Sequence, residues 1–532
     1  MDRGADNGVH VIFRSSYPDV DIPDVSLPAF VLEGAAALGN KKALIDGPTG
    51  RTLTYAELAT AVRQVAANLA RRGFRKGDVF AIYSPNVLEY AVALHAVATL
   101  GGIATTANPL STPRELALQL KNAGATYLVT IPELREQALE ATRQSPVKEV
   151  FVFGEAAGFT PFAALMDGNG AVPAVAIDPG KDLVALPYSS GTTGLPKGVM
   201  LTHRNLVANI VQTSAVIRAP EGEVTIAVLP FYHIYGFTVL LNISLYQGVT
   251  IVTMPRFDLE LFLRLLQDYK VTRANVVPPI VLALAKHPLV AKYDLHALQS
   301  INSGAAPLDA SVEQACSDRL NCFVAQGYGL TETSPVVSTT PVDPERRRGG
   351  SAGLLIPNTE CKVMDPSSGA ELGPGELGEV WIRGPQVMAG YLNNFEATAA
   401  MLDADGWLHS GDIGSVDADG YLRVVDRLKE LIKYKGYQVA PAELEGLLLT
   451  HPAVADAAVI PCPDLESGEV PKALVVLKGT VTPDELMTFV NQQVAPYKKI
   501  RQLEVVSAIP KSPSGKILRR VLVEQERTRT AT

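Results

Sequence analysis

Short apolar runs alternate with longer segments of helical periodicity in the first third of the chain, and this pattern limits the possible folds more than any other feature. Residues 79–83 (VFAIY) form an unbroken apolar run typical of a buried strand, and residues 128–130 and 150–152 repeat it. Residues 59–69 and 87–99 carry apolar residues at helical spacing. Strands that alternate with helices predict parallel sheets covered by helices, which is an α/β fold.

One stretch could be mistaken for a membrane span, because residues 224–255 contain no Asp, Glu, Lys or Arg. Polar and helix-breaking residues interrupt it, among them Pro230, Asn242 and Gly248. We therefore predict a strand, a loop, a helix and a second strand of a buried core, and we expect no membrane span.

A change of composition near Asp426 predicts the main domain boundary. Residues 427–532 carry 15 basic and 12 acidic residues, whereas the preceding residues carry 32 basic and 43 acidic ones. Pro441 followed by acidic residues in the first turns indicates a helix start inside this basic part. We predict a large domain over 1–426 and a small one over 427–532. The net charge of −8 argues against a general nucleic-acid binder.

The strongest local motif is SSGTTGLPKG, residues 189–198, between the predicted strands 183–188 and 199–201. Glycines let backbone N–H groups approach a ligand, hydroxyls donate hydrogen bonds, and a lysine neutralises charge. The spacing is not that of a Walker loop, which has four residues between its glycines. A flexible hairpin is the alternative. The motif favours polyphosphate binding by Ser189, Ser190, Gly191, Thr192, Thr193 and Lys197.

Three further motifs are each ambiguous on their own. GYGLTE, residues 327–332, offers a tyrosine to stack on a base, a threonine for a phosphate and a glutamate for Mg²⁺. Asp412 in GWLHSGD, residues 406–412, could bind a ribose diol. Lys516 follows a Ser-Gly turn in PKSPSGKILRR, residues 510–520. Taken singly, ordinary turns and solvated charges explain these residues at least as well.

Together and in this order, the four motifs resemble the adenylate-forming superfamily of acyl-CoA synthetases, luciferases and peptide-synthetase adenylation domains, over about residues 53–520. The stretches 426–445 (DRLKELIKYKGYQVAPAELE) and 229–236 (LPFYHIYG) are most similar to 4-coumarate:CoA ligases. The resemblance implies a large N-terminal domain of two β/α sheets and a small β-barrel, followed by a small mobile α+β domain.

The resemblance also implies a two-step reaction with ATP, Mg²⁺ and coenzyme A. A carboxylate attacks the α-phosphorus of ATP, which gives acyl-AMP and pyrophosphate. The coenzyme A thiol then attacks the activated carbonyl, and AMP leaves.

Roles for individual residues follow from the resemblance alone. The loop from Ser189 to Lys197 would grip the β- and γ-phosphates. The other nucleotide contacts would be Gln326, Gly327 and Tyr328 at adenine, Thr331 at the α-phosphate, Asp412 and Arg427 at the ribose, and Glu332 at Mg²⁺. The reacting groups would be served by Lys516, by Lys433 and Gln438 as supports of the adenylate, and by His233 as a gate. Coenzyme A would meet Arg256, Lys435 and Gly436.

The implied acyl pocket is small and apolar with one phenol, and consists of Tyr235, Gly236, Val239, Ser303, Gly304, Ala305, Gly329, Pro335 and Val336. This composition suits a flat aromatic acid, with cinnamate or 4-coumarate as the leading choice. Departures from the ligase pattern, such as Trp381 in place of a cysteine, weaken that choice. A medium-chain fatty acyl-CoA synthetase and a catalytically dead nucleotide-binding sensor remain alternatives.

The four cysteines are scattered and form no CxxC pair, which predicts free thiols in a reducing compartment. The first 20 residues contain no apolar core of a signal peptide. We expect a cytoplasmic enzyme that acts on small molecules and has no obligatory protein partner.

Overall fold

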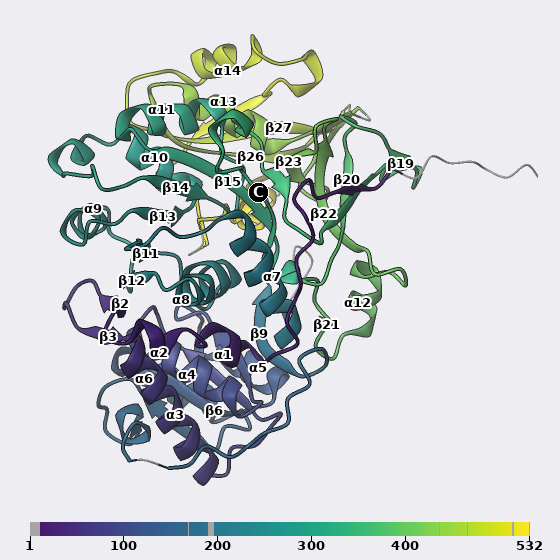
Figure 1. The fold of residues 1–532 in the computed structure, drawn as a ribbon. Helices are drawn as coiled ribbons and strands as arrows, with labels where there is room; N and C mark the ends of the chain where they lie inside the picture. The colour runs from purple at the N-terminus through teal and green to yellow at the C-terminus, as the bar shows by residue number, and fades with distance from the viewer. Residues whose placement is uncertain are drawn as a thin grey trace, which may run out of the picture.

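The computed structural model describes residues 11–168, 170–189, 196–435, 437–464, 467–512 and 515–530. Its strands form three sheets, and the two larger ones contain runs of parallel strands. Figure 1 shows that the C-terminal part lies on one side of a larger body, and that the end of the chain returns to the middle of the molecule. The predicted mixed α/β fold with a large and a small domain is confirmed.

The first sheet contains eight strands in the order β21-β10-β9-β5-β4-β6-β7-β8. Strands β9 to β8 pair in parallel, whereas β10 and β21 pair antiparallel at one edge. The predicted strands and helices of the first third all occur here. The strands are β4 (Val79–Tyr83), β5 (Ile103–Ala107), β6 (Ala125–Thr130), β7 (Glu149–Val152), β8 (Thr160–Pro161), β9 (Leu183–Ser189), β10 (Lys197–Thr202) and β21 (Gly390–Tyr391).

Four helices pack against this sheet or beside it: α3 (Tyr55–Arg71), α4 (Leu88–Thr99), α5 (Pro113–Ala123) and α6 (Arg135–Thr142). The sequence sets their ends. The Thr54 hydroxyl accepts a hydrogen bond from the Glu57 N–H, and the Glu57 carboxylate accepts one from the Thr54 N–H, which caps α3. Almost every residue of α4 is buried, as its continuous apolar sequence predicts.

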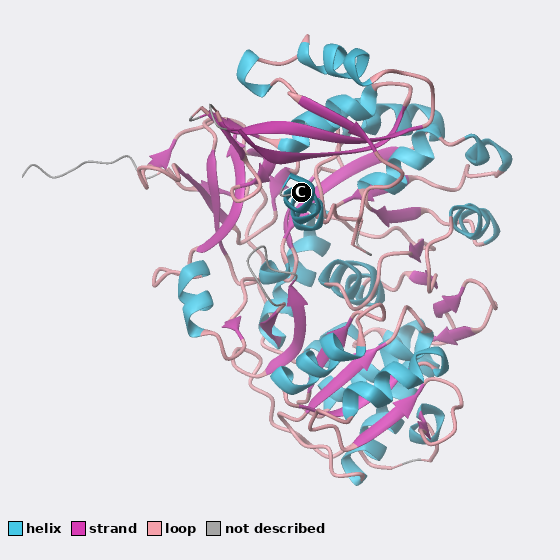
Figure 2. Ribbon diagram, turned by 180° about the vertical axis from the view of Figure 1, so that it is seen from behind, coloured by secondary structure: helices cyan, strands magenta, loops and turns pink. Residues whose placement is uncertain are grey.

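The second sheet joins a parallel half to an antiparallel half. Its parallel strands are β2 (Lys42–Asp46), β12 (Thr250–Thr253), β11 (Val224–Ala227), β13 (Arg273–Val276), β14 (Ser300–Ser303) and β15 (Phe323–Gly329). Antiparallel pairing of β15 with β16 continues the sheet into the region where the sequence predicts a small barrel. The strands there are β16 (Val336–Thr339), β17 (Gly353–Leu355), β23 (Tyr421–Arg427), β22 (Leu408–Val416), β20 (Gly378–Arg383), β18 (Glu360–Met364), β19 (Glu371–Leu372) and β1 (Phe13–Arg14), while β3 (Thr52–Thr54) closes the opposite edge. Figure 2 shows these antiparallel strands to one side of the helix-covered body.

The charge-free stretch 224–255 forms β11, a helix and β12 inside this body. The helix begins as a π-helix, η3 (Tyr235–Ile243), and ends in the short α8 (Ser244–Tyr246). No helix of the described ranges is long and apolar enough to cross a membrane. The other helices of the body are α1 (Leu27–Val31), α2 (Ala35–Leu38), α7 (His203–Val216), α9 (Leu259–Asp268), α10 (Pro278–Lys286), α11 (Ala310–Leu320) and α12 (Phe395–Met401).

The third sheet is small and belongs to the C-terminal part. It consists of β24 (Ile432–Tyr434), β25 (Tyr437–Val439), β26 (Val454–Asp464), β27 (Gly468–Leu477) and β28 (Gln502–Val505), with helices α13 (Pro441–Thr450), α14 (Pro483–Asn491) and α15 (Arg519–Thr530). The predicted helix start at Pro441 is confirmed. A separate cluster of buried apolar side chains, among them Leu444 and Val475, forms the core of this part.

All four cysteines are buried and free, in agreement with the prediction of unpaired thiols. Burial raises the pKa of Cys322 to about 11 and the pKa values of Cys316 and Cys361 to about 12. Burial also raises the pKa of the Cys462 thiol.

Candidate active site

A cavity of about 1950 Å³ lies where the two large sheets meet the C-terminal part. It brings together most of the residues that the sequence motifs predict. The predicted residues that line it are Ser189, Lys197, His233, Tyr235, Val239, Gly304, Ala305, Gly327, Tyr328, Gly329, Thr331, Glu332, Pro335, Val336, Arg427 and Lys516. Motifs separated by more than 300 residues in sequence therefore share one cavity.

The predicted phosphate loop joins β9 to β10. These strands pair antiparallel with Ser189 opposite Lys197, so the two ends of the loop lie side by side. The Lys197 ammonium lies 4.9 Å from the centre of the Tyr391 ring. The predicted contacts Ser190, Gly191, Thr192 and Thr193 lie outside the described residues.

Tyr391 connects the phosphate loop to the predicted metal ligand. Its hydroxyl donates a 2.7 Å hydrogen bond to Oε1 of Glu332, and its position on β21 follows from the pairing of this strand with β10. Tyr391 is not among the site residues that the sequence motifs predict. The signal available was the Gly-Tyr pair at 390–391, which forms a short edge strand.

Glu332 fits a Mg²⁺ ion that is held mainly by a nucleotide. Its side chain is 7% exposed, lines the cavity, and is anchored through one carboxylate oxygen by Tyr391. No group of three or more His, Cys, Asp or Glu side chains in the described ranges forms a complete metal site. Mg²⁺ in nucleotide enzymes is commonly bound by one or two carboxylates together with substrate phosphates.

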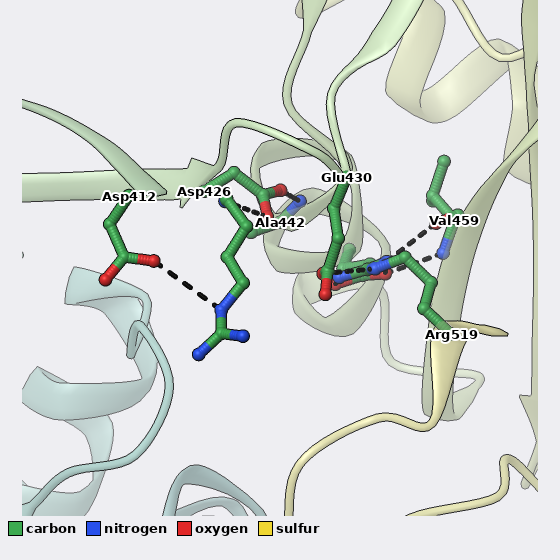
Figure 3. A network of polar contacts seen from close by, with 8 residues as sticks. Asp412, Asp426, Glu430, Ala442, Val459 and Arg519 are labelled. Carbon is green, nitrogen blue, oxygen red and sulfur yellow. Dashed lines mark hydrogen bonds and ion pairs between the residues drawn. The ribbon is translucent and has the colours of Figure 1, made fainter. Parts of the chain in front are cut away.

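Asp412 and Arg427 are neighbours on the paired strands β22 and β23, and their side chains form an ion pair with 3.5 Å between Oδ1 and Nε (Figure 3). The Tyr328 hydroxyl donates a 2.6 Å hydrogen bond to Oδ2 of Asp412. Burial raises the pKa of Asp412, and the Arg427 guanidinium opposes this shift. Asp412 itself does not line the cavity, because Tyr328 and Arg427 cover its carboxylate.

Lys516 lies inside the cavity on the segment between β28 and α15. Burial and the neighbouring Arg427 guanidinium lower the pKa of its ammonium to about 8, against the opposing effect of Glu430 and Asp412. Its backbone is fixed by Ser512, whose hydroxyl accepts from the Lys516 N–H and whose N–H donates to the Lys516 carbonyl. A lysine from the C-terminal part thus reaches residues of the large body.

His233 is near enough to Lys516 for the lysine charge to influence it. Burial, and secondarily Lys516, lower the pKa of the His233 imidazole to about 4, so the ring is neutral at physiological pH. Its Nδ1 accepts a 3.3 Å hydrogen bond from the Tyr235 N–H. The position of His233 is compatible with a gate between the nucleotide and acyl ends of the cavity.

A buried arginine, Arg519, fixes the segment that carries Lys516 (Figure 3). Its guanidinium forms ion pairs with Glu430, at 2.9 Å, and with Glu445, and donates to the Val459 carbonyl at 2.7 Å. The Val459 N–H in turn donates to Glu445. Neither Glu445 nor Arg519 is among the site residues that the sequence motifs predict, although Arg519 is three residues from Lys516.

Asp426 marks the end of the large body's last strand and contacts the C-terminal part. Its side chain accepts hydrogen bonds from the N–H groups of Arg427 and of Ala442 in α13 (Figure 3). Burial raises the pKa of the Asp426 carboxyl to about 6.

The part of the cavity that is predicted to hold the acyl group depends on close packing around Tyr235. The Tyr235 hydroxyl donates a 3.2 Å hydrogen bond to the Asn302 carbonyl, so the phenol presents its ring to a ligand. A Cβ on Gly304 would lie 2.8 Å from Cε1 of this ring, which is possible only if the ring shifts. A Cβ on Gly329 would lie 2.0 Å from the Pro335 carbonyl oxygen.

Several predicted residues lie away from the cavity. Gly236 and Ser303 are buried behind it, and a Cβ on Gly236 would lie 2.1 Å from the Pro230 oxygen, so its role is close packing. The Gln326 side chain points away from Gly327 and bonds Glu313 and the backbone of Leu308. The Gln326 amide therefore already has hydrogen-bond partners within the protein.

The predicted adenylate support Lys433 and the predicted coenzyme A contacts Lys435 and Arg256 are exposed and do not line the cavity. Gly436 and the side chain of Gln438 lie outside the described part of the chain. The arrangement of the two parts thus places Lys516 in the cavity and leaves Lys433, Lys435 and Arg256 outside it.

Comparison with known proteins places this site in a family. Residues 32–392 match the AMP-binding enzyme family, and residues 443–516 match the AMP-binding enzyme C-terminal domain. Among curated proteins, 4-coumarate–CoA ligase 5 of Oryza sativa subsp. japonica and 4-coumarate–CoA ligase 2 of Petroselinum crispum are each 44% identical, over 96% of this chain and 96% of the relative.

Solved structures agree over nearly the whole length. ATP-bound MatB from Rhodopseudomonas palustris has a TM-score of 0.86 at 29% identity, covering 94% of this chain and 99% of that protein. The anthranilate CoA ligase AuaEII in complex with anthranoyl-AMP has a TM-score of 0.87 at 25% identity, covering 96% of this chain and 99% of that protein. The chain therefore belongs to the adenylate-forming family of AMP-binding enzymes.

Proposed function

We propose that the protein is an ATP-dependent acid–thiol ligase that converts a 4-coumarate- or cinnamate-like acid into its coenzyme A thioester through an acyl-adenylate. One observation carries this proposal: a single cavity contains Lys516, Lys197 and Glu332 next to a pocket formed by Tyr235 and Gly304. The similarity to 4-coumarate–CoA ligases supports the aromatic substrate.

In the first step the chain's own groups act mainly through position and charge. Lys197 and the hydroxyls of its loop would hold the terminal phosphates, and Lys516 would stabilise the charge that develops between the α-phosphate and the attacking carboxylate. Glu332 would hold Mg²⁺, which would supply further neutralisation of the phosphates. Tyr235 would place the acid with its carboxylate toward His233.

The second step requires a different arrangement of the C-terminal part. We propose that residues 427–532 move as one domain relative to 1–426 and bring Lys435 and Gly436 to the cavity, opposite Arg256. The exposed positions of Lys433, Lys435 and Arg256 support this, as does the contact of Asp426 with both parts. A cytosolic location belongs to the same proposal and is supported by the four free thiols.

Pyrophosphate release measured with a panel of acids, with and without coenzyme A, tests the function. Cinnamate or 4-coumarate should release pyrophosphate in both cases, and a thioester should form only when coenzyme A is present. Faster turnover of medium-chain fatty acids would replace the substrate assignment. No release with any acid would favour the nucleotide-binding sensor.

The pKa of Lys516 predicts the alkaline limit of adenylation. The protonated ammonium is the form that stabilises phosphate charge, so kcat/KM for ATP should fall as the pH rises through about 8. In Lys516→Arg the residual activity should no longer fall as the pH rises through about 8, because a guanidinium stays protonated in this range. The same fall in kcat/KM in both enzymes would mean that another group titrates.

Gly304→Ala tests the packing against Tyr235. The added Cβ would lie 2.8 Å from the ring, so we expect the KM for the acid to rise about tenfold, as overpacking costs roughly 1–3 kcal/mol. The KM for ATP should stay near its original value. Gly349→Ala is the control, because a Cβ at Gly349 meets its nearest atom at 3.7 Å. Equal changes for acid and ATP would refute a role confined to the acyl end.

A further inference from the structure

Beyond Gly304 the cavity continues along one face of the parallel strands. Side chains two residues apart on a strand share a face, and the strand register aligns them in rows. The row of Gly304 is followed by one of Asn275, Asn302 and Ala325, and then by one of Thr225, Arg273, Ser300 and Phe323, all of which line the cavity. Gly304, the residue after β14, is four positions from Ser300, so this wall extends about 13 Å.

The opposite wall is formed by η3, α8 and the residue that follows them. The side chains that line it recur every four residues: Tyr235, Val239, Ile243 and Gln247. Tyr235 stands beside Gly304, and Gln247 is at the other end of the series. Both walls therefore run from the site of the carboxylate to the same far end.

Helix α7 closes the channel at that end. The Gln247 amide donates to the Ser214 hydroxyl and to the Ile217 carbonyl, which holds the last turn of α7 against it. Thr213 and Ile217 line the cavity from this turn.

The middle of the channel is lined by apolar and small residues. Val239, Ile243, Ala325 and Gly327 line this part. A Cβ on Gly327 would lie 3.2 Å from the Ser338 carbonyl oxygen, so close approach of β15 and β16 favours a residue without a side chain here. A flat apolar group matches this part.

The far end, in contrast, is polar and buried. Glu223, 5% exposed, pairs with Arg273 at 3.0 Å. The Thr213 hydroxyl at this end, and Oδ1 of Asn302 in the row before it, are buried and have no hydrogen-bond partner among the described residues. Nearly all buried polar atoms in proteins bond to something, so a ligand or bound water is expected here.

We propose that the acid substrate is longer than 4-coumarate and ends, opposite its carboxylate, in a neutral hydrogen-bonding group such as a hydroxyl or an amide. Thr213, Asn275, Asn302 and the Glu223–Arg273 pair receive that group. Arg273 is already paired with Glu223, so a second carboxylate would meet no unpaired guanidinium there. This proposal rests on the proposed acyl-adenylating function and specifies its substrate class.

Four acids of graded length and polarity test the proposal: 4-coumarate and its O-butyl, O-(4-hydroxybutyl) and O-(3-carboxypropyl) ethers. The readout is kcat/KM for pyrophosphate release without coenzyme A. We expect the hydroxybutyl ether to exceed both the butyl and the carboxypropyl ether about tenfold, the effect of pairing buried polar groups.

Substitutions of channel residues test whether these residues cause the preference for the hydroxybutyl ether. Thr213→Val and the double change Glu223→Gln with Arg273→Met should each reduce the ratio of the hydroxybutyl to the butyl ether toward one. The ratio is internal to each preparation, so partial loss of folded protein does not alter it. Thr60→Val, on the exposed side of α3, should retain the ratio of the original protein.

Three results would overturn the proposal. Turnover of 4-coumarate with rejection of all three ethers would show that acids do not enter the channel, and the proposed function would stand. Preference for the butyl or the carboxypropyl ether would contradict the neutral polar end. If neither these four acids nor any other carboxylic acid causes pyrophosphate release, the proposed function itself is wrong.

Discussion

Lys516→Ala is expected to slow acyl-adenylate formation by ~10²–10³-fold or more, the usual effect of removing one preorganised charge-stabilising group from an active site. Lys516 is one of the cations that the C-terminal part contributes to the cavity, and its charge influences His233. Single-turnover measurement of adenylate from ATP and acid gives the first rate. Thioester formation from pre-made acyl-AMP and coenzyme A gives the second, which should be largely retained.

The role of Lys516 follows from how the rates of adenylate and thioester formation change relative to each other. Lys478→Ala removes an exposed lysine of the C-terminal part outside the cavity and should leave both rates unchanged. Equal losses in the two steps of Lys516→Ala would mean that the lysine stays in the cavity throughout the reaction. The proposed rearrangement of residues 427–532 would then be wrong.

Arg519→Met should lower the free energy of unfolding of the C-terminal part by about 3–5 kcal/mol, because removing one partner of a buried ion pair leaves charge uncompensated. Glu445 and Glu430 would lose their cation, and the Val459 carbonyl would lose a donor. Urea unfolding followed by hydrogen exchange of β26 and α13 measures this loss region by region.

The neighbouring residue supplies a matched control. Arg520 is exposed and pairs with Glu524 one turn along α15, so Arg520→Met should change stability by less than about 0.5 kcal/mol. Similar destabilisation by the two substitutions would mean that the network in Figure 3 contributes no more than a surface pair.

Much of the fold could be predicted because local sequence determined it. The apolar run 79–83 is β4 without a residue of error, and the helix predicted at 87–99 is α4, Leu88–Thr99. All of β4 and almost all of α4 are buried, so little surface requirement competes with their propensity. It was harder to predict from the sequence that the two halves of the second sheet are continuous, because this depends on pairing between β15 and β16.

The site was predicted least well where a residue's role depends on direction or on distant partners. Gln326 precedes Gly327 on a strand, so its side chain points to the opposite face and reaches Glu313. Tyr391 and Arg519 act through partners that no sequence spacing reveals. Lys433, Lys435 and Arg256 depend on how the two parts of the chain are oriented, which motifs do not encode.

The burial of the four cysteines has a chemical consequence for an enzyme of this kind. An acyl-adenylate and an acyl thioester are electrophiles that any thiolate can attack. With pKa values raised by burial, to about 11 or 12 for three of them, the protein's own thiols contain almost no thiolate near neutral pH. Burial thus disfavours acylation of the protein's own thiols.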